Sequence, residues 1–241
     1  QGLRVYENWA CSKLDGVIAA TPFIRDNFLS INPNTMDINN FPLLDELASA
    51  SNWNHKNPDV CYVGGIGIVR GIVEMIEAMN LTKTDARLNL AGKFGDKQTQ
   101  RQVEEMPGWQ QVNAFGFLER SKVRDLLDRS VGGLVTFHPE PNHLDSQPNK
   151  MFEYMSAGIP VIASDFPLWR AIIAGNDCGL LVDPLKPSQI AEAIDALVSN
   201  PRDAERMGRN GRKAVLDYFN WPNEERKLVE FYERLLIAPE D

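Results

Sequence analysis

The sequence is short of cysteine. Its 241 residues contain three, Cys11, Cys61 and Cys178, which lie far apart. An odd number without a Cys-x-x-Cys pair or clustered histidines predicts neither a disulfide framework nor a zinc site. The sequence also lacks the roughly 18 consecutive apolar residues that a membrane-spanning helix needs, and a basic-then-apolar leader. We therefore expect free thiols and a cytoplasmic protein.

Positive charge is scarce as well. The chain has 25 Lys and Arg against 33 Asp and Glu, a formal net charge of −8. Nucleic-acid binding needs a basic surface that displaces counterions from phosphates, so the composition argues against nucleic acid as a partner. Any anionic ligand must be held by local cations.

What the sequence does contain is an alternation of β-branched runs and amphipathic stretches, typical of parallel α/β proteins. Strands are expected at 59–65, 86–92, 111–117, 131–137, 160–165 and 178–183. Helices are expected at 70–80, 96–106, 119–129, 148–157 and 167–174, and then near 187–199, 201–218 and 222–236. The pattern predicts an α/β fold with a doubly wound, parallel, six-stranded Rossmann-like sheet and C-terminal helices.

The first forty residues do not continue this alternation. Residues 15–21 indicate one strand and residues 22–30 its helix, but a single βα unit cannot bury both faces of its strand. The NNFP stretch, 39–42, has the turn formers and proline of a linker. We therefore divide the chain into a βα remnant of an upstream domain with a hinge, a ligand-binding domain and a last helix: 1–41, 42–220 and 221–241.

The segment GGIGIVRG, 64–71, follows the first strand of the large domain. Ligands of open parallel sheets bind beyond the carboxyl ends of the strands. Gly64 and Gly65 permit a close backbone approach, the next helix offers free N–H groups to an anion, and Arg70 could contact phosphate. A plain glycine turn with an exposed arginine is the alternative.

The spacing of Gly65, Gly67 and Gly71 also makes an NAD(P)-binding dehydrogenase a candidate function. That class expects an acidic residue at the end of the second strand, where it binds a ribose. Here Asp85 precedes the second strand, so the dehydrogenase stays a minor alternative.

The stretch DSQPNKMFEYMSAGIPVIASD, 145–165, combines a helix start with the charged residues Asp145, Lys150 and Glu153 around it. Pro148 suits a first helical turn that Gln147 or Asn149 could cap, after an irregular loop 138–147. Asp145, Lys150 and Glu153 would then border one pocket. A carboxylate suits a vicinal diol such as that of ribose, whereas a helix N-terminus with a lysine suits a diphosphate. The alternatives are an Asx turn for Asp145 and a solvated Glu153, and we assign His138 and His143 to the surface.

The segment PNKMFEYMSAGIPVIASDFPLW, 148–169, resembles the retaining GT-B glycosyltransferases of family four, or group 1. The resemblance extends over essentially the whole chain, with support from YVGGIGIVRG, AFGF, NPRDAERMGRNGR and FNW. It implies that 42–220 binds a nucleotide-sugar donor such as a UDP- or GDP-sugar, without a metal or cofactor. It further implies a missing N-terminal domain that binds the acceptor and to which the last helix crosses back.

The resemblance also implies roles for individual residues. Glu153 ends an E-x7-E motif and would bind the ribose, and Asp145, in place of the usual first glutamate, would face the transferred sugar. Arg70 would hold the diphosphate, with Gly65 where the family has an arginine and Lys150 supplying the lost charge. The remaining site residues would contact base, phosphates or sugar: Gly64, Phe115, Phe117, Ser146, Gln147 and Asn149.

The implied reaction is sugar transfer with retained anomeric configuration, in polysaccharide or glycoconjugate assembly. Its acceptor would be a lipid-linked or glycan acceptor at the inner membrane surface, which the missing domain would reach. A GT-B-fold epimerase and a non-catalytic nucleotide-sugar sensor remain alternatives, because either would share the donor site.

Overall fold

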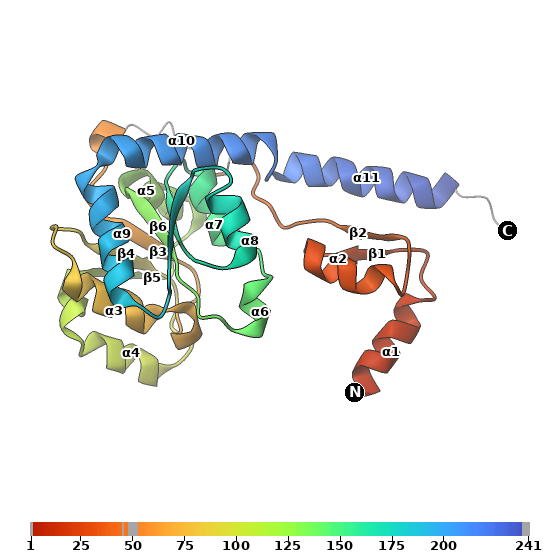
Figure 1. Ribbon diagram of the computed structural model, residues 1–241, viewed down its shortest axis with the longest axis horizontal. Coiled ribbons are helices and arrows are strands. Elements are labelled where there is room, and N and C mark those ends of the chain that lie inside the picture. The colour runs from red at the N-terminus through yellow and green to blue at the C-terminus, as the bar shows by residue number, and fades with distance from the viewer. Residues whose placement is uncertain (1, 45, 48–52, 238–241) are drawn as a thin grey trace. The chain divides into compact units, whose positions relative to one another are not determined.

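The computed structural model describes residues 2–44, 46–47 and 53–237, and it divides into two units. Unit 1 draws on the ranges 1–43 and 218–241, and unit 2 on 44–217 (Figure 1). Residue 1 and residues 238–241, at the ends of the predicted segments 1–41 and 221–241, lie outside the described part. The predicted domain roles of these segments stay predictions.

Unit 2 is built on a parallel sheet of six strands in the order β5-β4-β3-β6-β7-β8. Their bounds are β3 Val60–Val63, β4 Leu88–Ala91, β5 Val112–Gly116, β6 Gly132–Val135, β7 Val161–Ser164 and β8 Gly179–Val182. The prediction of a doubly wound six-stranded sheet is confirmed. Each strand is shorter than its apolar run, because the first and last residues of each run belong to the loops at the two ends of the strand.

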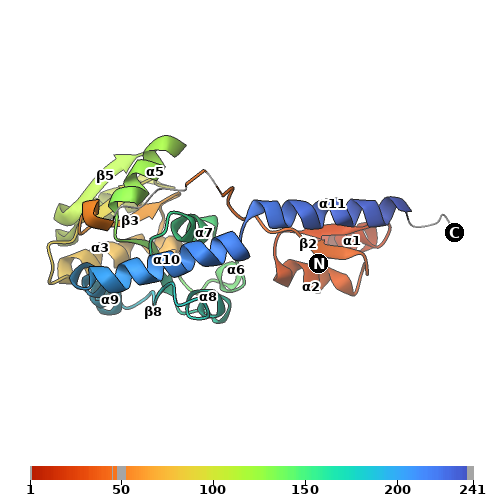
Figure 2. The same ribbon diagram turned by 90° about the horizontal axis from the view of Figure 1, so that it is seen from above.

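Helices connect the strands of unit 2 (Figures 1 and 2). The α-helices are α3 Ile72–Leu81, α4 Lys97–Glu104, α5 Arg120–Arg129, α6 Pro141–Leu144, α7 Asn149–Ser156, α8 Pro167–Ile173, α9 Pro187–Ser199 and α10 Pro201–Asp217. The 3-10 helices are η1 Trp53–His55, η2 Ile68–Arg70 and η3 Pro107–Gln111. Packing pairs α3 with α9 and α7 with α10. Right-handed crossovers place the helices of the two halves on opposite faces of the sheet.

Two helix predictions need correction. The helix expected at 70–80 is divided into η2 and α3, because Gly71 between them has a left-handed φ of 81°. The loop 138–147, expected to be irregular, contains the short helix α6, which begins at Pro141. Four residues are too few for a helical period to show in the sequence.

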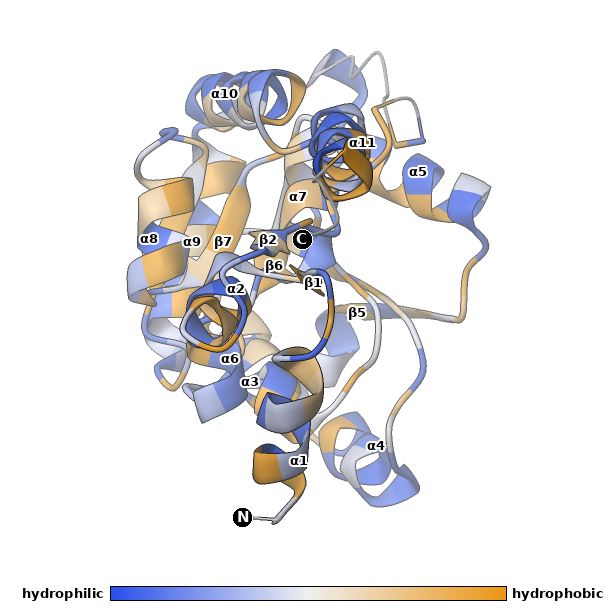
Figure 3. Cartoon of the chain, turned by 90° about the vertical axis from the view of Figure 1, so that its right-hand side faces the viewer, coloured by the Kyte–Doolittle hydropathy of each residue, from blue (hydrophilic) through white to orange (hydrophobic). Residues whose placement is uncertain are grey.

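The core of unit 2 follows the expected hydropathy. Every residue of β7 is buried, whereas α10 buries one side, including Ala204, Met207 and Val215. Figure 3 shows the corresponding colours, orange along β7 and mixed turns along α10. A strand buried on both faces and an amphipathic covering helix are what a doubly wound sheet requires.

Unit 1 contains more structure than the single βα unit predicted from the sequence. Its elements are α1 Gly2–Cys11, β1 Val17–Ala19, α2 Pro22–Leu29, β2 Thr35–Asp37 and α11 Trp221–Ile237. Strands β1 and β2 pair in parallel, and the Thr21 hydroxyl caps α2. The prediction missed α1 and β2. In the case of β2, a strand of three residues shows no alternation and is defined only by its distant partner.

One buried carboxylate joins α11 to the rest of unit 1. Glu224 Oε2 accepts the Asn39 backbone N–H at 2.7 Å and the Asn39 side chain at 3.1 Å. The Lys227 ammonium donates to the same oxygen at 2.9 Å. The C-terminal helix is therefore fixed to the segment that follows β2. None of the helices in the described residues has the length and hydropathy that a membrane crossing requires.

Candidate functional site

The strand order reverses between β3 and β6: the strands after β3 are added on one side of it, and β6 and its successors on the other. These strands pair only through Val60 with Gly132 and Cys61 with Gly133, so their last residues separate. β3 and β4, in contrast, pair along four residues. A crevice at the carboxyl ends of the strands, where the order reverses, is the usual ligand position in this architecture.

Tyr154 fills the place where β3 and β6 separate. Its hydroxyl accepts the Val63 backbone N–H at 2.9 Å, a donor that no strand partner takes. Gly133 leaves room for the ring, since a Cβ there would lie 2.3 Å from a ring carbon of Tyr154. The side chain is fully buried, and burial raises the pKa of its phenol well above the ordinary value. The Tyr154 ring and hydroxyl therefore fill the space where the two strands separate.

The loop after β3 carries the first predicted cation. Gly64 has a φ of 126°, and a Cβ on Gly65 would lie 3.0 Å from Arg70 Nη1. The absence of a side chain at Gly65 therefore makes room for the guanidinium, which donates to the Gly65 carbonyl at 3.3 Å. The guanidinium also lies 5.7 Å from the centre of the Phe137 ring, beyond the end of β6.

Lys150, on α7, brings a second cation to the same loop. A Cβ on Gly64 would lie 3.2 Å from its Nζ, and Nζ stands 3.5 Å from the centre of the Tyr62 ring. The ammonium is buried and finds no hydrogen-bond partner among the described residues. Burial, and then the charge of Arg70, lower the pKa of Lys150 well below its usual value. Two cations thus converge where neither pairs with a described carboxylate, as an anion-binding site requires.

Glu153 lies one turn further along α7, where its side chain is 17% exposed. Its Oε1 accepts from Arg120 Nη1 at 2.8 Å. Arg120, at the first residue of α5, also pairs with both carboxylate oxygens of Glu46. The structure therefore gives the predicted ribose ligand a partner that sequence spacing did not indicate.

The start of α7 differs from the prediction. Pro148 is itself the N-cap residue, and no side chain caps the helix, so neither Gln147 nor Asn149 does so. Asn149 is the first helical residue, and the buried Oε1 of Gln147 has no hydrogen-bond partner among the described residues. Proline fixes an extended entry to the helix, which leaves the first N–H groups of α7 without a side-chain acceptor.

The two residues before Gln147 are held differently. Ser146 donates its hydroxyl to the His143 carbonyl at 2.8 Å, and its own carbonyl accepts from the Trp169 indole at 2.8 Å. Asp145 follows α6 as its C-cap and is exposed. The backbone of Ser146 is therefore anchored, whereas the Asp145 carboxylate is available to a ligand.

An apolar cavity of about 240 Å³ lies at the carboxyl ends of β3, β4 and β5. Its lining includes Gly64, Gly65 and Phe117, and also Lys93, whose Nζ stands 5.2 Å from the Phe117 ring centre. Phe115, two residues earlier on β5, lines a separate polar cavity of about 340 Å³. Of these two phenylalanines, Phe117 lines the apolar cavity at the ends of β3 and β4, whereas Phe115 lines the other one.

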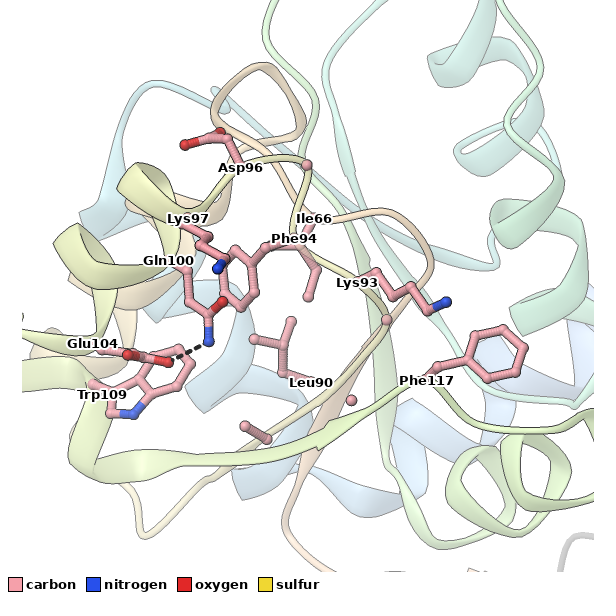
Figure 4. A pocket seen from close by; sticks show the side chains of 14 residues that line it. Ile66, Leu90, Lys93, Phe94, Asp96, Lys97, Gln100, Glu104, Trp109 and Phe117 are labelled. Carbon is pink, nitrogen blue, oxygen red and sulfur yellow. Dashed lines mark hydrogen bonds between the residues drawn. The ribbon is translucent and has the colours of Figure 1, made fainter.

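A larger cavity of about 450 Å³ adjoins the first and shares Gly92, Lys93 and Phe117 with it. Figure 4 shows Lys93 beside Phe117 at one end, and Trp109 with Glu104 at the other. Gln100 donates to Glu104 at 2.7 Å within it. The smaller cavity therefore adjoins a larger one that is bordered on one side by residues of α4.

The prediction that His138 is a surface residue without an acidic partner is wrong. Its Nε2 lies 2.9 Å from Glu74 Oε2, and both side chains are largely buried. The backbone N–H of His138 also donates to the Val69 carbonyl at 3.0 Å. These contacts link the end of β6 to the segment that carries Arg70, so they help to place that cation.

Sequence reasoning did not single out Lys93 or Arg120 as site residues. Lys93 follows β4 directly, so the rule that ligands bind at the carboxyl ends of strands could have found it. Arg120 carried no such signal, because its partners Glu46 and Glu153 are 74 and 33 residues away.

The chain is similar to known glycosyltransferases. Residues 45–214 match the family model described as Glycosyl transferases group 1. The alpha-maltose-1-phosphate synthase of Mycolicibacterium smegmatis is 25% identical over 256 residues, which cover 95% of this chain and 65% of that protein. The chain therefore spans less than two thirds of the length of that relative.

Solved structures share the fold. The sucrose-phosphate synthase of Thermosynechococcus elongatus has a TM-score of 0.80 at 23% identity, over 98% of this chain and 62% of that one. HepE of Anabaena in complex with UDP has a TM-score of 0.81 at 16% identity, over 96% of this chain and 67% of its own. HepE has also been solved with UDP-glucose, at a TM-score of 0.80 and 17% identity over the same shares.

Proposed function

Since the chain belongs to the group 1 glycosyl transferases, we propose that it is the donor-binding part of an enzyme that transfers a sugar from a nucleoside-diphosphate sugar to an acceptor. The observation that carries the proposal is the buried Lys150 ammonium, which has no hydrogen-bond partner in the described structure and lies near Gly64, with Arg70 on the same loop. Burying an ammonium is costly unless an anion joins it, and a diphosphate is such an anion. The complexes of HepE with UDP and UDP-glucose support a ligand of this kind.

In this proposal the residues divide the donor between them. Glu153 accepts the ribose hydroxyls, and Phe117 and Lys93 flank the base in the 240 Å³ cavity. Arg70, Lys150 and the free N–H groups at the start of α7 hold the diphosphate. Asp145 faces the sugar. Backbone groups of Gly64, Gly65, Phe115, Ser146, Gln147 and Asn149 complete the contacts.

The same cations serve the reaction. When the bond between sugar and diphosphate breaks, negative charge grows on the leaving oxygen, and prearranged cations stabilise it more than they stabilise the intact donor. We propose that transfer retains the anomeric configuration, with the leaving phosphate assisting deprotonation of the acceptor. No resident cofactor or metal enters this scheme.

The acceptor and the cellular setting belong to the same proposal. An N-terminal domain, of which unit 1 is the remnant, would bind the acceptor, and the fragment alone would transfer little. We propose a cytoplasmic enzyme of polysaccharide or glycoconjugate assembly, which meets a lipid-linked or glycan acceptor at the inner membrane face through that domain.

The first test is ligand binding by the chain and by its Glu153→Ala variant. Thermal shift with UDP, GDP, UDP-glucose, GDP-mannose, uridine and NADH should show stabilisation by a diphosphate and little by uridine or NADH. In calorimetry, Glu153→Ala should weaken the preferred diphosphate about tenfold or more, because a charged hydrogen bond contributes roughly 1.5–3 kcal/mol. Stabilisation by NADH alone, or an unchanged affinity of the variant, would contradict the proposed donor site.

A further inference from the structure

We infer that Arg120 is a positioning residue for Glu153: held by Glu46, it fixes the carboxylate that binds the ribose of the donor and keeps this carboxylate away from Lys150. The inference rests on the proposed function, because it takes Glu153 as the ribose ligand. The inference adds Arg120, a residue that acts on the donor only through Glu153.

The three-residue contact has a defined geometry. Arg120 Nε donates to Glu46 Oε1 at 2.7 Å and Nη2 to Glu46 Oε2 at 2.9 Å. Such a two-pronged pair fixes the plane of a guanidinium. The remaining nitrogen, Nη1, donates to Glu153 Oε1 at 2.8 Å. The direction of Nη1, and with it the carboxylate, is therefore set by Glu46.

This geometry leaves half of the Glu153 carboxylate open. Its Oε1 is occupied by Arg120, whereas Oε2 accepts no hydrogen bond from a described residue. A ribose hydroxyl can therefore donate to Oε2, and a second can reach the other lone pair of Oε1. A carboxylate held in one orientation binds a diol better than one that rotates, because less freedom is lost on binding.

The position of Lys150 explains why Arg120 must hold the Glu153 carboxylate. It precedes Glu153 by three residues on α7, a spacing at which acid and lysine side chains pair on a helix. A Glu153–Lys150 pair would occupy the ammonium that the diphosphate requires and the carboxylate that the ribose requires. In the structure Glu153 pairs with Arg120 instead, and Nζ of Lys150 stays without a hydrogen-bond partner in the described chain.

The experiment compares UDP with 2′-deoxy-UDP by calorimetry on the 241-residue chain, with GDP and 2′-deoxy-GDP as a second pair. Removing Arg120 also leaves two carboxylates unpaired, which repels both nucleotides equally, so the ratio of the two affinities isolates the ribose contact. Arg120→Ala should lower this ratio by about fivefold or more, since a charged hydrogen bond is lost or weakened. Glu46→Gln should lower it in the same direction by less.

Two further variants serve as controls. Arg124→Ala, on the exposed side of the same helix, should leave the ratio unchanged. Arg120→Lys keeps the charge and loses the planar fork, so it should restore only part of the ratio. It also provides the readout should Arg120→Ala fold poorly, as judged by its melting temperature.

The outcomes separate the two claims. If Glu153→Ala abolishes the preference for the 2′-hydroxyl and Arg120→Ala preserves it, Arg120 is not a positioning residue and the donor site stands. If the unsubstituted chain shows no such preference, or Glu153→Ala keeps it, the ribose role of Glu153 fails and the inference with it. An equal loss for both nucleotides in Arg120→Ala would reduce Arg120 to a general electrostatic or structural contribution.

Discussion

Lys150 is costly to the free chain at the scale of one residue. An ammonium that is buried without a hydrogen-bond partner loses hydration that the Tyr62 ring restores only in part. Its pKa is lowered, first by burial and then by Arg70. The unfolded chain, in contrast, holds the proton up to the ordinary lysine value of about 10.4. Folding is therefore opposed at neutral pH, and the opposition fades as the pH rises toward that value.

Lys150→Met should consequently stabilise the free chain while weakening UDP binding. Methionine fills a similar volume without a charge, so we expect a gain of about 1–3 kcal/mol in the free energy of unfolding at pH 7, shrinking toward pH 10. UDP affinity should fall about tenfold or more. Urea unfolding between pH 6 and pH 10 and calorimetry measure the two effects. Lys122→Met, at an exposed lysine, is the control, and a destabilised Lys150→Met chain that binds UDP normally would refute the anion role.

At the scale of the element, the end of β4 depends on a glycine. Gly92 has a φ of 149°, and a Cβ there would lie 1.8 Å from the Gly64 carbonyl oxygen. No side-chain movement can relieve a clash between backbone atoms. The loops after β3 and β4, which bring Gly64 and Lys93 together, can approach only because residue 92 has no side chain.

Gly92→Ala should therefore destabilise unit 2 and disturb the cavity of about 240 Å³ that Gly92 lines. We expect a loss of roughly 2–4 kcal/mol in the free energy of unfolding, measured with urea. Gly95→Ala is the matched control, because its Cβ would meet the Ile66 carbonyl at an ordinary 3.6 Å. That variant should stay within about 1 kcal/mol of the parent chain. Equal stability of the two variants would show that the loop moves freely.

The same scale shows what the sequence could predict. All six strands of the large sheet, and the helices from 187 onward, follow from apolar runs long enough to reveal their period. The two-stranded sheet of unit 1 could not be predicted, because β2 is three residues long and exists only through its pairing with β1. At the candidate site, the sequence points to Arg70, Lys150 and Glu153 through their places after a strand and at a helix start, and their roles stay predictions. Arg120 and the His138–Glu74 contact depend on tertiary structure that spacing does not encode.

At the scale of the whole molecule, the chain's last helix belongs to the unit formed by its first residues. The contact depends on Glu224, whose side chain is 4% exposed and which joins Asn39 to Lys227. Next to it, burial would raise the pKa of Asp37, but Asn39, Lys227 and Arg25 together lower it. Stability from Asp37 is thus present above its ordinary pKa of about 3.9 and is lost as the pH falls through the lowered value.

Glu224→Ala should loosen unit 1 without affecting unit 2. The change leaves the Asn39 N–H and the Lys227 ammonium without their acceptor, which costs about 3 kcal/mol or more of local stability. Hydrogen exchange should accelerate in β2 and α11 and stay constant in β3, β6 and β7. Glu225→Ala, at the exposed neighbour, should change neither. Faster exchange throughout the sheet of unit 2 would mean that the two units unfold as one.

The buried phenol of Tyr154 has a consequence for how the proposed donor site would respond to mutation. Between β3 and β6 lie a ring buried in the interior and the missing side chain of Gly133, not the loops that would contact the proposed donor. Under the proposed function, mutations in those loops would therefore change the choice of base or sugar while the separation of the two strands stays constant. In a saturation library of this region, we expect many substitutions in the loops to leave the chain folded. Substitutions of Tyr154 and Gly133 should instead destabilise it.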